Sequence, residues 1–347
     1  MIFSQGAVEN WVKVTLILCA FGTLREIRPS EPFVSEFLSG PWRNVTEDQL
    51  NRDVYPISTY SYSAQLVVIF LITDFLRFKP VIILSGLTGI AIYAILLWTK
   101  GIPWIQVSQF LYGTYIATEV AYYTYMYAKV DSSKYPRVSS YTRIATLVGR
   151  SLSGLSAQLL THFGLMDYMS LTYITFVAQI LATFWALWLP AVQYGIYFHR
   201  KSSTFDSHIV SGNKLEHNQT VKQSLRSDIT TACYMIARHA HAAYRRPRVV
   251  VWSALYAVTL TLFVQVQTYA QLQWKQIQEG SETPIAYNGA VEAVQTLAGA
   301  GSALVASLVT RAPLPALAAA LQAAALFLGT YCRNIYAAYA GYIVLGV

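Results

Sequence analysis

This chain has few charged residues and few cysteines, and both shortages narrow the class of protein. Charged side chains make up 12% of the 347 residues, about half of the ~25% that is usual in a soluble domain. The three cysteines, Cys19, Cys233 and Cys332, are far apart in sequence. Neither a disulfide framework nor a cysteine metal cluster is therefore indicated.

The chain also lacks the motifs of common hydrolytic and phosphate-binding enzymes. It has no His-Glu-x-x-His, no Gly-x-Ser-x-Gly and no glycine-rich loop followed by Lys and Ser or Thr. The net charge of +8 comes from short basic segments between apolar runs, which are typical of topology signals rather than of a nucleic-acid-binding face. We therefore expect no enzyme, no cofactor, no metal site and no nucleic-acid partner.

What the chain does have is long apolar runs. A helix needs about 20 largely apolar residues to cross the hydrocarbon of a bilayer, and nine stretches qualify. They are, roughly, 11–27, 56–75, 80–99, 103–128, 138–163, 168–189, 249–271, 286–308 and 313–332. A tenth run begins near Asn334 and is cut off at Val347, so we expect a fragment that lacks two helices and most of a third.

The order of these runs predicts two halves. Residues 1–190 would form an N-terminal six-helix bundle, 191–247 a polar cytoplasmic central loop, and 248–347 an incomplete C-terminal bundle, as in a two-bundle transporter. The excess of Lys and Arg in alternate loops places the N-terminus in the cytoplasm. The sequon at Asn44 would then lie outside and could be glycosylated.

Glu119 is the most informative single residue, because it lies near the middle of an apolar, tyrosine-rich run. A carboxylate at that depth is costly and usually faces a partner or a water-filled cavity. Tyr115, Tyr122 and Tyr123 are its neighbours on a helix. Aromatic rings beside a carboxylate suit a flat cation. A structural ion pair or a protonated acid remains the alternative.

Two arginines and a second acid form a further set of candidates. Arg143 and Arg150 are seven residues apart, hence on one helix face. Arg143 is near the cytoplasmic end, where a structural or gating role is expected. Arg150 is near mid-span and either contacts an anionic group of a substrate or pairs with a carboxylate such as Glu119. Glu292 either contacts substrate or bonds to another helix.

The segment from Asp74 to Pro80 joins two predicted spans on the cytoplasmic side. It contains the acid Asp74 and the bases Arg77 and Lys79. An acid and bases at a helix junction can latch two helices in one transport state and release them in the other. Ordinary positive flanking of the spans is the alternative.

Five motifs, in order, resemble one known family. They are Arg28-Pro-Ser-Glu31-Pro-Phe33, Tyr60-Ser-Tyr62, Thr73-Asp74-Phe-Leu-Arg77-Phe-Lys-Pro80, Glu119-Val-Ala-Tyr122-Tyr123 and Tyr287-Asn-Gly-Ala-Val-Glu-Ala293. The family is that of the reduced folate carrier and thiamine transporters, solute carrier family 19. The resemblance implies the major facilitator fold: about twelve helices in two bundles around a central cavity of alternating access. It also implies that residues 28–38 are embedded in the membrane.

Within this family the chain is most similar to the thiamine transporters, which carry Glu at the position of Glu119, where the folate carrier has Arg. The resemblance implies that Glu119 binds the aminopyrimidine or charge of thiamine and that Tyr122 stacks on it. The full set of substrate-binding residues expected on this basis is Glu119, Tyr122, Glu31, Tyr55, Thr59, Tyr115, Arg150, Gln267, Thr268 and Glu292.

Three departures from the family pattern concern the ligand. Ser58 stands where the family has Trp, Thr268 where the thiamine transporters have Asn, and Arg150 where they have an aromatic residue. Less stacking surface and a new cation favour a phosphorylated or otherwise anionic vitamin. The match at Glu119 nevertheless leads us to expect a monomeric, multi-pass plasma-membrane carrier of thiamine or a thiamine-like cation. The alternative is a carrier of reduced folate or another organic anion, including phosphorylated thiamine.

Overall fold

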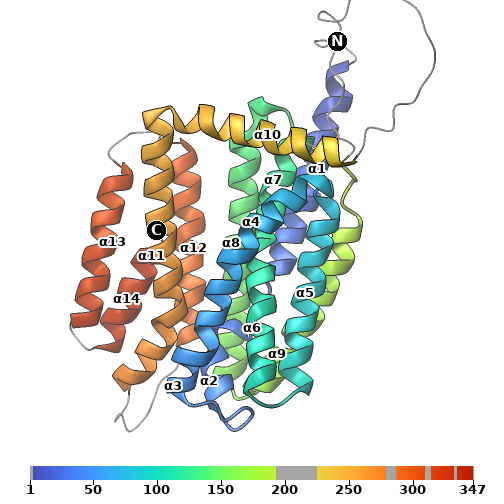
Figure 1. The fold of residues 1–347 in the computed structure, drawn as a ribbon. Helices are drawn as coiled ribbons and strands as arrows, with labels where there is room; N and C mark the ends of the chain where they lie inside the picture. Colours follow the sequence, from blue (N-terminus) through green and yellow to red (C-terminus); the bar gives the residue numbers. More distant parts are fainter. Residues whose placement is uncertain (1–2, 193–224, 279–286, 309–313, 332–333, 347) are drawn as a thin grey trace, which may run out of the picture.

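The computed structural model describes residues 3–192, 225–278, 287–308, 314–331 and 334–346 (Figure 1). Within these ranges the chain is helical and contains no strand. The expectation of an all-α protein is therefore confirmed for the described part of the chain.

The helices follow the predicted runs closely. The first half contains α1 (Phe3–Glu26), η1 (Glu31–Phe33), α2 (Val34–Ser39), α3 (Glu47–Gln49), η2 (Leu50–Val54), α4 (Tyr55–Phe75), α5 (Lys79–Trp98), α6 (Ile102–Ala117), α7 (Glu119–Lys129), η3 (Ser132–Lys134), α8 (Tyr135–His162) and α9 (Tyr168–Leu187). The remainder contains α10 (Leu225–Tyr244), α11 (Pro247–Gln278), α12 (Asn288–Leu308), α13 (Leu314–Tyr331) and α14 (Ile335–Leu345). The run 103–128, expected as one helix, is divided at Thr118.

Several of these helices fit a bilayer by length and composition. Four segments of the described chain are long and apolar enough to cross one: Glu47–Phe75, Lys79–Trp98, Tyr168–Leu187 and Pro247–Gln278. Large apolar side chains are exposed on their surfaces, for example Val67 at 64% and Phe184 at 65%. Such exposure is expected where lipid, rather than water, is the solvent. The chain is therefore a multi-pass membrane protein.

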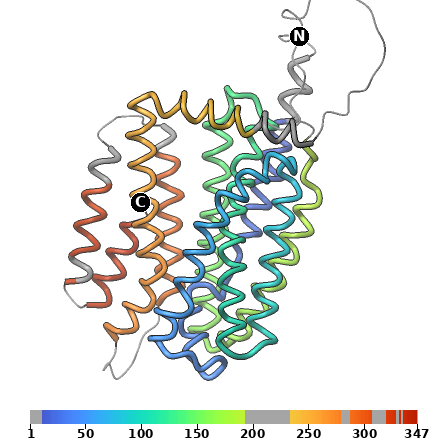
Figure 2. The backbone as a smooth tube through the Cα atoms, in the orientation of Figure 1, coloured from blue at the N-terminus to red at the C-terminus, as the bar shows by residue number. Residues whose placement is uncertain are grey.

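The helices gather into two groups that lie side by side. In Figure 1, α1 and α4–α9 form one group and α11–α14 the other, and the continuous backbone in Figure 2 shows the same division. Within the first group α5 packs on α9 and α6, and α4 packs on α6. The main contact between the groups is that of α8 with α12.

Helix α10 lies within the predicted central loop, so residues 225–244 of that connecting segment are helical. This segment has no Gly or Pro, and apolar residues recur at helical spacing from Leu225 to Ala243. Because the segment is polar overall, the helical spacing of its apolar residues was not recognised in the sequence. Figure 1 shows α10 running across one end of the bundles, roughly perpendicular to their helices. The rest of the predicted loop lies outside the described residues.

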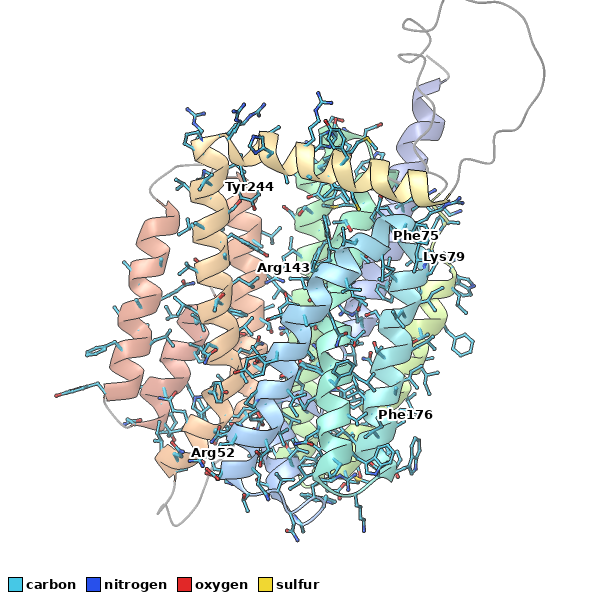
Figure 3. All side chains as sticks on the ribbon, in the orientation of Figure 1. Arg52, Phe75, Lys79, Arg143, Phe176 and Tyr244 are labelled. Atoms are coloured by element: carbon cyan, nitrogen blue, oxygen red, sulfur yellow. The ribbon has the colours of Figure 1, made fainter. Side chains whose placement is uncertain are left out.

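The two ends of the molecule carry different segments. Phe75, Lys79 and Tyr244 lie near the end covered by α10, and Arg52 lies near the opposite end, with α2 and α3 (Figure 3). We call these the α10 end and the α2–α3 end. The segment from Asp74 to Pro80 and the end of the central segment therefore share one side, as the charge pattern predicts. Asn44, exposed between α2 and α3, belongs to the other.

Two glycines let the groups approach at the contact of α8 with α12. A Cβ atom built on Gly154 would lie 2.6 Å from the carbonyl oxygen of Gly289 and 3.0 Å from the amide nitrogen of Ala293. Both neighbours are backbone atoms, which cannot rotate away. Glycine at this position therefore sets the distance between the two halves.

We expect Gly154→Ala to lower stability by about 1–3 kcal/mol, because overpacking forces the backbones apart. Thermal unfolding of the purified protein measures this loss. Gly301→Ala is the matched control, since a Cβ there has no neighbour within 4 Å and Ala is the better helix former. Equal melting temperatures for the two variants would show that this contact does not limit stability.

Candidate functional site

The site begins where α1 ends. Pro29 disfavours helical backbone at the residue before it, and the helix stops at Glu26. The freed amides are satisfied by side chains of other helices, as a membrane interior requires. The amide of Arg28 donates to Ser153 Oγ at 2.8 Å, and that of Ser30 donates to Thr175 Oγ1 at 3.2 Å. A broken helix therefore lies against α8 and α9.

Charged residues at this break form a buried ion cluster of Arg25, Glu26, Arg28, Glu31 and Arg150. Glu26 Oε2 accepts from Arg28 Nη2 at 2.7 Å and from Arg150 Nε at 2.6 Å. Arg28 Nη2 also lies 3.0 Å from Glu31 Oε2. Arg25 Nη1 lies 3.7 Å from Glu26 Oε1. The side chains of Arg25, Glu26 and Arg28 are at most 4% exposed.

This cluster gives Arg150 a carboxylate partner, while contact of Arg150 with a substrate stays a prediction. Arg150 pairs with a carboxylate, and that carboxylate is Glu26 rather than Glu119. Sequence reasoning did not single out Arg25 or Glu26. The signal was present, because Arg25, Glu26 and Arg28 lie in or beside a segment expected to be embedded in the membrane. They were interpreted as residues at the end of a membrane-spanning helix rather than as residues inside the membrane.

The cluster holds more positive than negative groups. Three guanidinium groups share the carboxylates of Glu26 and Glu31. The Nε atoms of Arg25 and Arg28 are buried and have no hydrogen-bond partner among the described residues. Tyr112 adds a neutral donor, since its hydroxyl donates to Glu31 Oε1 at 2.9 Å. The cluster is thus arranged around carboxylates and would be weakened by the loss of either one.

Arg25 also explains the break between α6 and α7. The carbonyl of Tyr115 accepts from Arg25 Nη2 at 2.9 Å and from Thr118 Oγ1 at 2.7 Å. In an unbroken helix that carbonyl would accept from the amide of Glu119. The helix therefore restarts at Glu119, which is the first residue of α7.

Glu119 itself is half-buried at this break. Among the residues that the structure describes, its carboxylate makes no hydrogen bond or ion pair. It lies close enough to Arg25, Tyr62 and Tyr123 to interact with them electrostatically. A carboxylate without a direct partner at membrane depth is suited to a cationic ligand.

Other predicted binding residues occupy different surroundings. Tyr122 is 3% exposed and its hydroxyl donates to the carbonyl of Leu18 at 3.1 Å, so its ring lies in the core of the first half. Tyr115 is also buried, and Arg25 stacks on its ring. Neither ring is free to stack on a ligand in this conformation. Their roles in binding stay predictions.

The remaining predicted residues lie along α4, α11 and α12. Thr59 is exposed. Tyr55 is buried, and its hydroxyl lies 2.8 Å from Ser35 Oγ. Gln267 and Thr268 are half-buried on α11. Glu292 accepts from the hydroxyl of Tyr342 at 2.9 Å. An interhelical bond of this kind was one of the two alternatives for Glu292.

A cavity of about 250 Å³ lies between the two halves. Arg143, Leu147 and Arg150 line it from α8, opposite Phe263 of α11 and a face of α12. The α12 face contributes Gln295, Thr296, Gly299, Ser302 and Ala303, and Gly346 follows α14. Arg150 thus joins the buried ion cluster to the cavity. Figure 3 places Arg143 between α11 and the helices of the first half, toward the α10 end.

The halves are held together at the α2–α3 end by polar contacts, which we call the clasp. Lys275 Nζ lies 2.5 Å from Glu47 Oε1 and 3.3 Å from Ser39 Oγ. Gln271 Nε2 donates to the carbonyl of Glu31 at 3.0 Å. Asn288 Nδ2 donates to Glu36 Oε1 at 2.8 Å. These contacts close the α2–α3 end, and the cavity lies on the α10 side of them.

The predicted gating segment contains a strained turn. Arg77 and Phe78 have φ values of 62° and 66°, which L-residues rarely adopt. The amide of Lys79 donates to the carbonyl of Arg77 at 2.8 Å, which makes Phe78 the centre of a γ-turn of the rare strained type. Burial of Phe78 holds the turn. Lys79 Nζ donates to the carbonyl of Leu187 at 2.8 Å, so this base joins α5 to α9 within one half. Gating by Asp74, Arg77, Lys79 and Arg143 stays a prediction.

Comparisons with known proteins agree with the resemblance found in the motifs. Residues 9–347 match the family described as "Reduced folate carrier". Human "Thiamine transporter 2" is 34% identical over 97% of this chain and 74% of its own length. Human "Thiamine transporter 1" is 32% identical over 98% of this chain and 75% of its own length. "Folate-like transporter 2" of Caenorhabditis elegans is 35% identical over 88% of this chain and 68% of its own length.

Proposed function

This chain belongs to the reduced folate carrier family, and on that premise we propose that it carries thiamine or a thiamine-like cation by alternating access. The family indicates a carrier rather than an enzyme. Relatives named as thiamine transporters align with 97% or more of the chain. These relatives support a vitamin substrate, and Glu119 supports a positive charge on that substrate.

The observation that carries this proposal is the environment of Glu119. It is an acid at membrane depth that is half-buried beside a helix break. Within the described chain no guanidinium or ammonium group forms an ion pair with it, and Arg150 is bonded to Glu26 instead. A flat cation placed there would gain the carboxylate and the nearby rings of Tyr62 and Tyr123.

The arrangement of clasp and cavity supports two bundles that move against each other. Residues 1–190 would act as one bundle and 248–347 as part of the second, joined by 191–247. The clasp closes the α2–α3 end while the cavity lies toward the α10 end. Such a state is one of the two that alternating access requires. The major facilitator fold is part of this proposal.

The charge pattern supports a location and an orientation. We place the protein in the plasma membrane as a monomer, with its N-terminus and the α10 end in the cytoplasm. The α2–α3 end then faces outward, and Asn44, which is exposed there, would be glycosylated. In that orientation the described conformation faces inward.

A second candidate function is transport of a reduced folate or another organic anion, including phosphorylated thiamine. It is favoured by one observation, the lining of the cavity. Arg143 and Arg150 are its charged lining residues, and no carboxylate is among the described residues that line it. Gln295, which also lines the cavity, has a buried Nε2 without a hydrogen-bond partner in the described chain. These donors suit an anionic group.

Competition for uptake separates the two candidates. Cells that express the 347-residue protein would be given labelled thiamine with an excess of unlabelled thiamine, thiamine monophosphate or a reduced folate. We expect unlabelled thiamine to compete best. Stronger competition by the monophosphate or folate, lost in Arg150→Ala, would favour the anion carrier. Absence of saturable uptake of every vitamin tested would refute both.

A further inference from the structure

Glu36 is a second acid without a cationic partner, and it lies in the clasp, away from the cavity. It is on α2, and its Oε1 accepts from Asn288 Nδ2 of α12 at 2.8 Å. Its Oε2 is buried and has no hydrogen-bond partner among the described residues. Asn288 is 3% exposed. The carboxyl group is therefore enclosed between the two halves of the protein.

Titratable groups from four other helices face Glu36. They are Lys275 of α11, Tyr55 of α4, Tyr168 of α9 and Tyr339 of α14. The tyrosines are neutral near pH 7. Lys275 is the one cation of the four, and its ammonium group is held by Glu47 at 2.5 Å and by Ser39 at 3.3 Å. Its charge is thus largely compensated by a different carboxylate.

An unpaired carboxylate in this position opposes closure of the clasp. Burial disfavours the charged form of an acid when no cation balances it. Asn288 supplies one neutral hydrogen bond, which compensates only part of the lost hydration. A protonated Glu36 would keep the bond from Asn288 and would carry no charge into the interface. Closure is therefore easier after a proton has bound.

We propose that Glu36 is a proton-binding site that couples closure of the α2–α3 end to pH. This proposal rests on the alternating-access function proposed above and names the proton as a ligand of its clasp. Glu36 binds the proton more tightly in the closed state, where it is buried, than in the open state, where water reaches it. The closed state is then favoured as pH falls and is lost as pH rises.

The expected size of the effect follows from linkage. Glu36 has one protonation midpoint in the open state and a higher one in the closed state. Between these two pH values, binding of one proton changes the ratio of closed to open protein by up to about tenfold per pH unit. Outside that window the ratio is constant. Acid in the compartment that the α2–α3 end faces would therefore hold this end shut.

Distance measurements across the clasp test the proposal without any vitamin. Spin labels would be placed on cysteines introduced at Arg52 and Gln276 after replacement of Cys19, Cys233 and Cys332. Both positions are exposed; Arg52 lies near the α2–α3 end in Figure 3, and Gln276 follows Lys275 of the clasp. The full 347-residue chain in lipid nanodiscs would be measured from about pH 4, near the midpoint of a water-exposed Glu, to about pH 8. We expect one short distance at acidic pH and a growing longer population at alkaline pH.

Glu36→Gln and Glu36→Leu should remain closed at every pH, because neither side chain can ionise. Glu36→Asp should keep the pH response. Asp167→Asn is the matched control, since Asp167 is an exposed acid that caps α9, and it should leave the response unchanged. A wild-type distance that does not change with pH, or a Glu36→Gln response equal to that of wild type, would overturn the proposal.

Uptake assays distinguish this failure from failure of the proposed function. Vitamin uptake together with a pH-independent distance would refute the proton site alone. A pH-dependent distance that requires Glu36, in a protein that takes up no vitamin, would refute the transport proposal and support the proton site.

Discussion

Glu119→Gln is expected to reduce thiamine uptake about a hundredfold. Gln is nearly isosteric with Glu but carries no charge, so a bound cation would lose a charge-assisted contact. Such contacts contribute about 1.5–3 kcal/mol where they are partly buried, and a hundredfold change corresponds to about 2.7 kcal/mol. Initial rates of labelled thiamine uptake, normalised to the amount of protein at the cell surface, measure the effect.

Two further substitutions show whether charge is the cause. Glu119→Asp keeps the charge and should retain more uptake than Glu119→Gln. Glu119→Arg reverses the charge, and the resemblance to the folate carrier leads us to expect a relative gain for anionic vitamins. Thr59→Val changes an exposed side chain of α4 and tests a second residue that was predicted to bind substrate. If Glu119→Gln leaves uptake of every tested vitamin unchanged, Glu119 does not form the binding site.

The positions of the helices were predictable, because length and hydropathy alone determine where a chain can cross a bilayer. The predicted run 80–99 and α5 (Lys79–Trp98) differ by one residue at each end. Helix α10 was missed because its overall composition is polar, although the 3.6-residue period of its apolar residues was visible in the sequence. Composition identifies a segment that spans the membrane far better than an amphipathic helix of polar composition.

The details of the site depended on contacts between distant segments, which one sequence does not contain. At the break before Glu119, the carbonyl of Tyr115 accepts from Arg25, which lies ninety residues before Tyr115 in the chain. Pairing with a carboxylate was one of two alternatives for Arg150, and the pairing with Glu26 rather than Glu119 depends on how α1 packs on α8. The inward position of Tyr122 likewise depends on Leu18 of α1.

Glu26→Gln should destabilise the protein by about 3–5 kcal/mol, the range observed when one partner of a buried ion pair is removed. Glu26 Oε2 accepts from both Arg28 and Arg150, and Glu26 Oε1 lies 3.7 Å from Arg25. Loss of its charge leaves three guanidinium groups with Glu31 alone. Chemical or thermal unfolding of the purified protein in detergent measures the loss. Glu47→Gln is the matched control, because its ion pair with Lys275 is half-exposed and is expected to contribute about 1 kcal/mol or less.

A double-mutant cycle then separates the cost of unbalanced charge from the loss of hydrogen bonds. Arg150→Gln removes one guanidinium, so the pair Glu26→Gln and Arg150→Gln should be more stable than the sum of the single losses predicts. We expect a coupling of about 1–3 kcal/mol, as found for groups in one network. Additive losses, or a Glu26→Gln loss no greater than that of Glu47→Gln, would mean that Glu26 does not neutralise the cluster. Arg150 would then retain its charge for a substrate, and the anion carrier would become the better hypothesis.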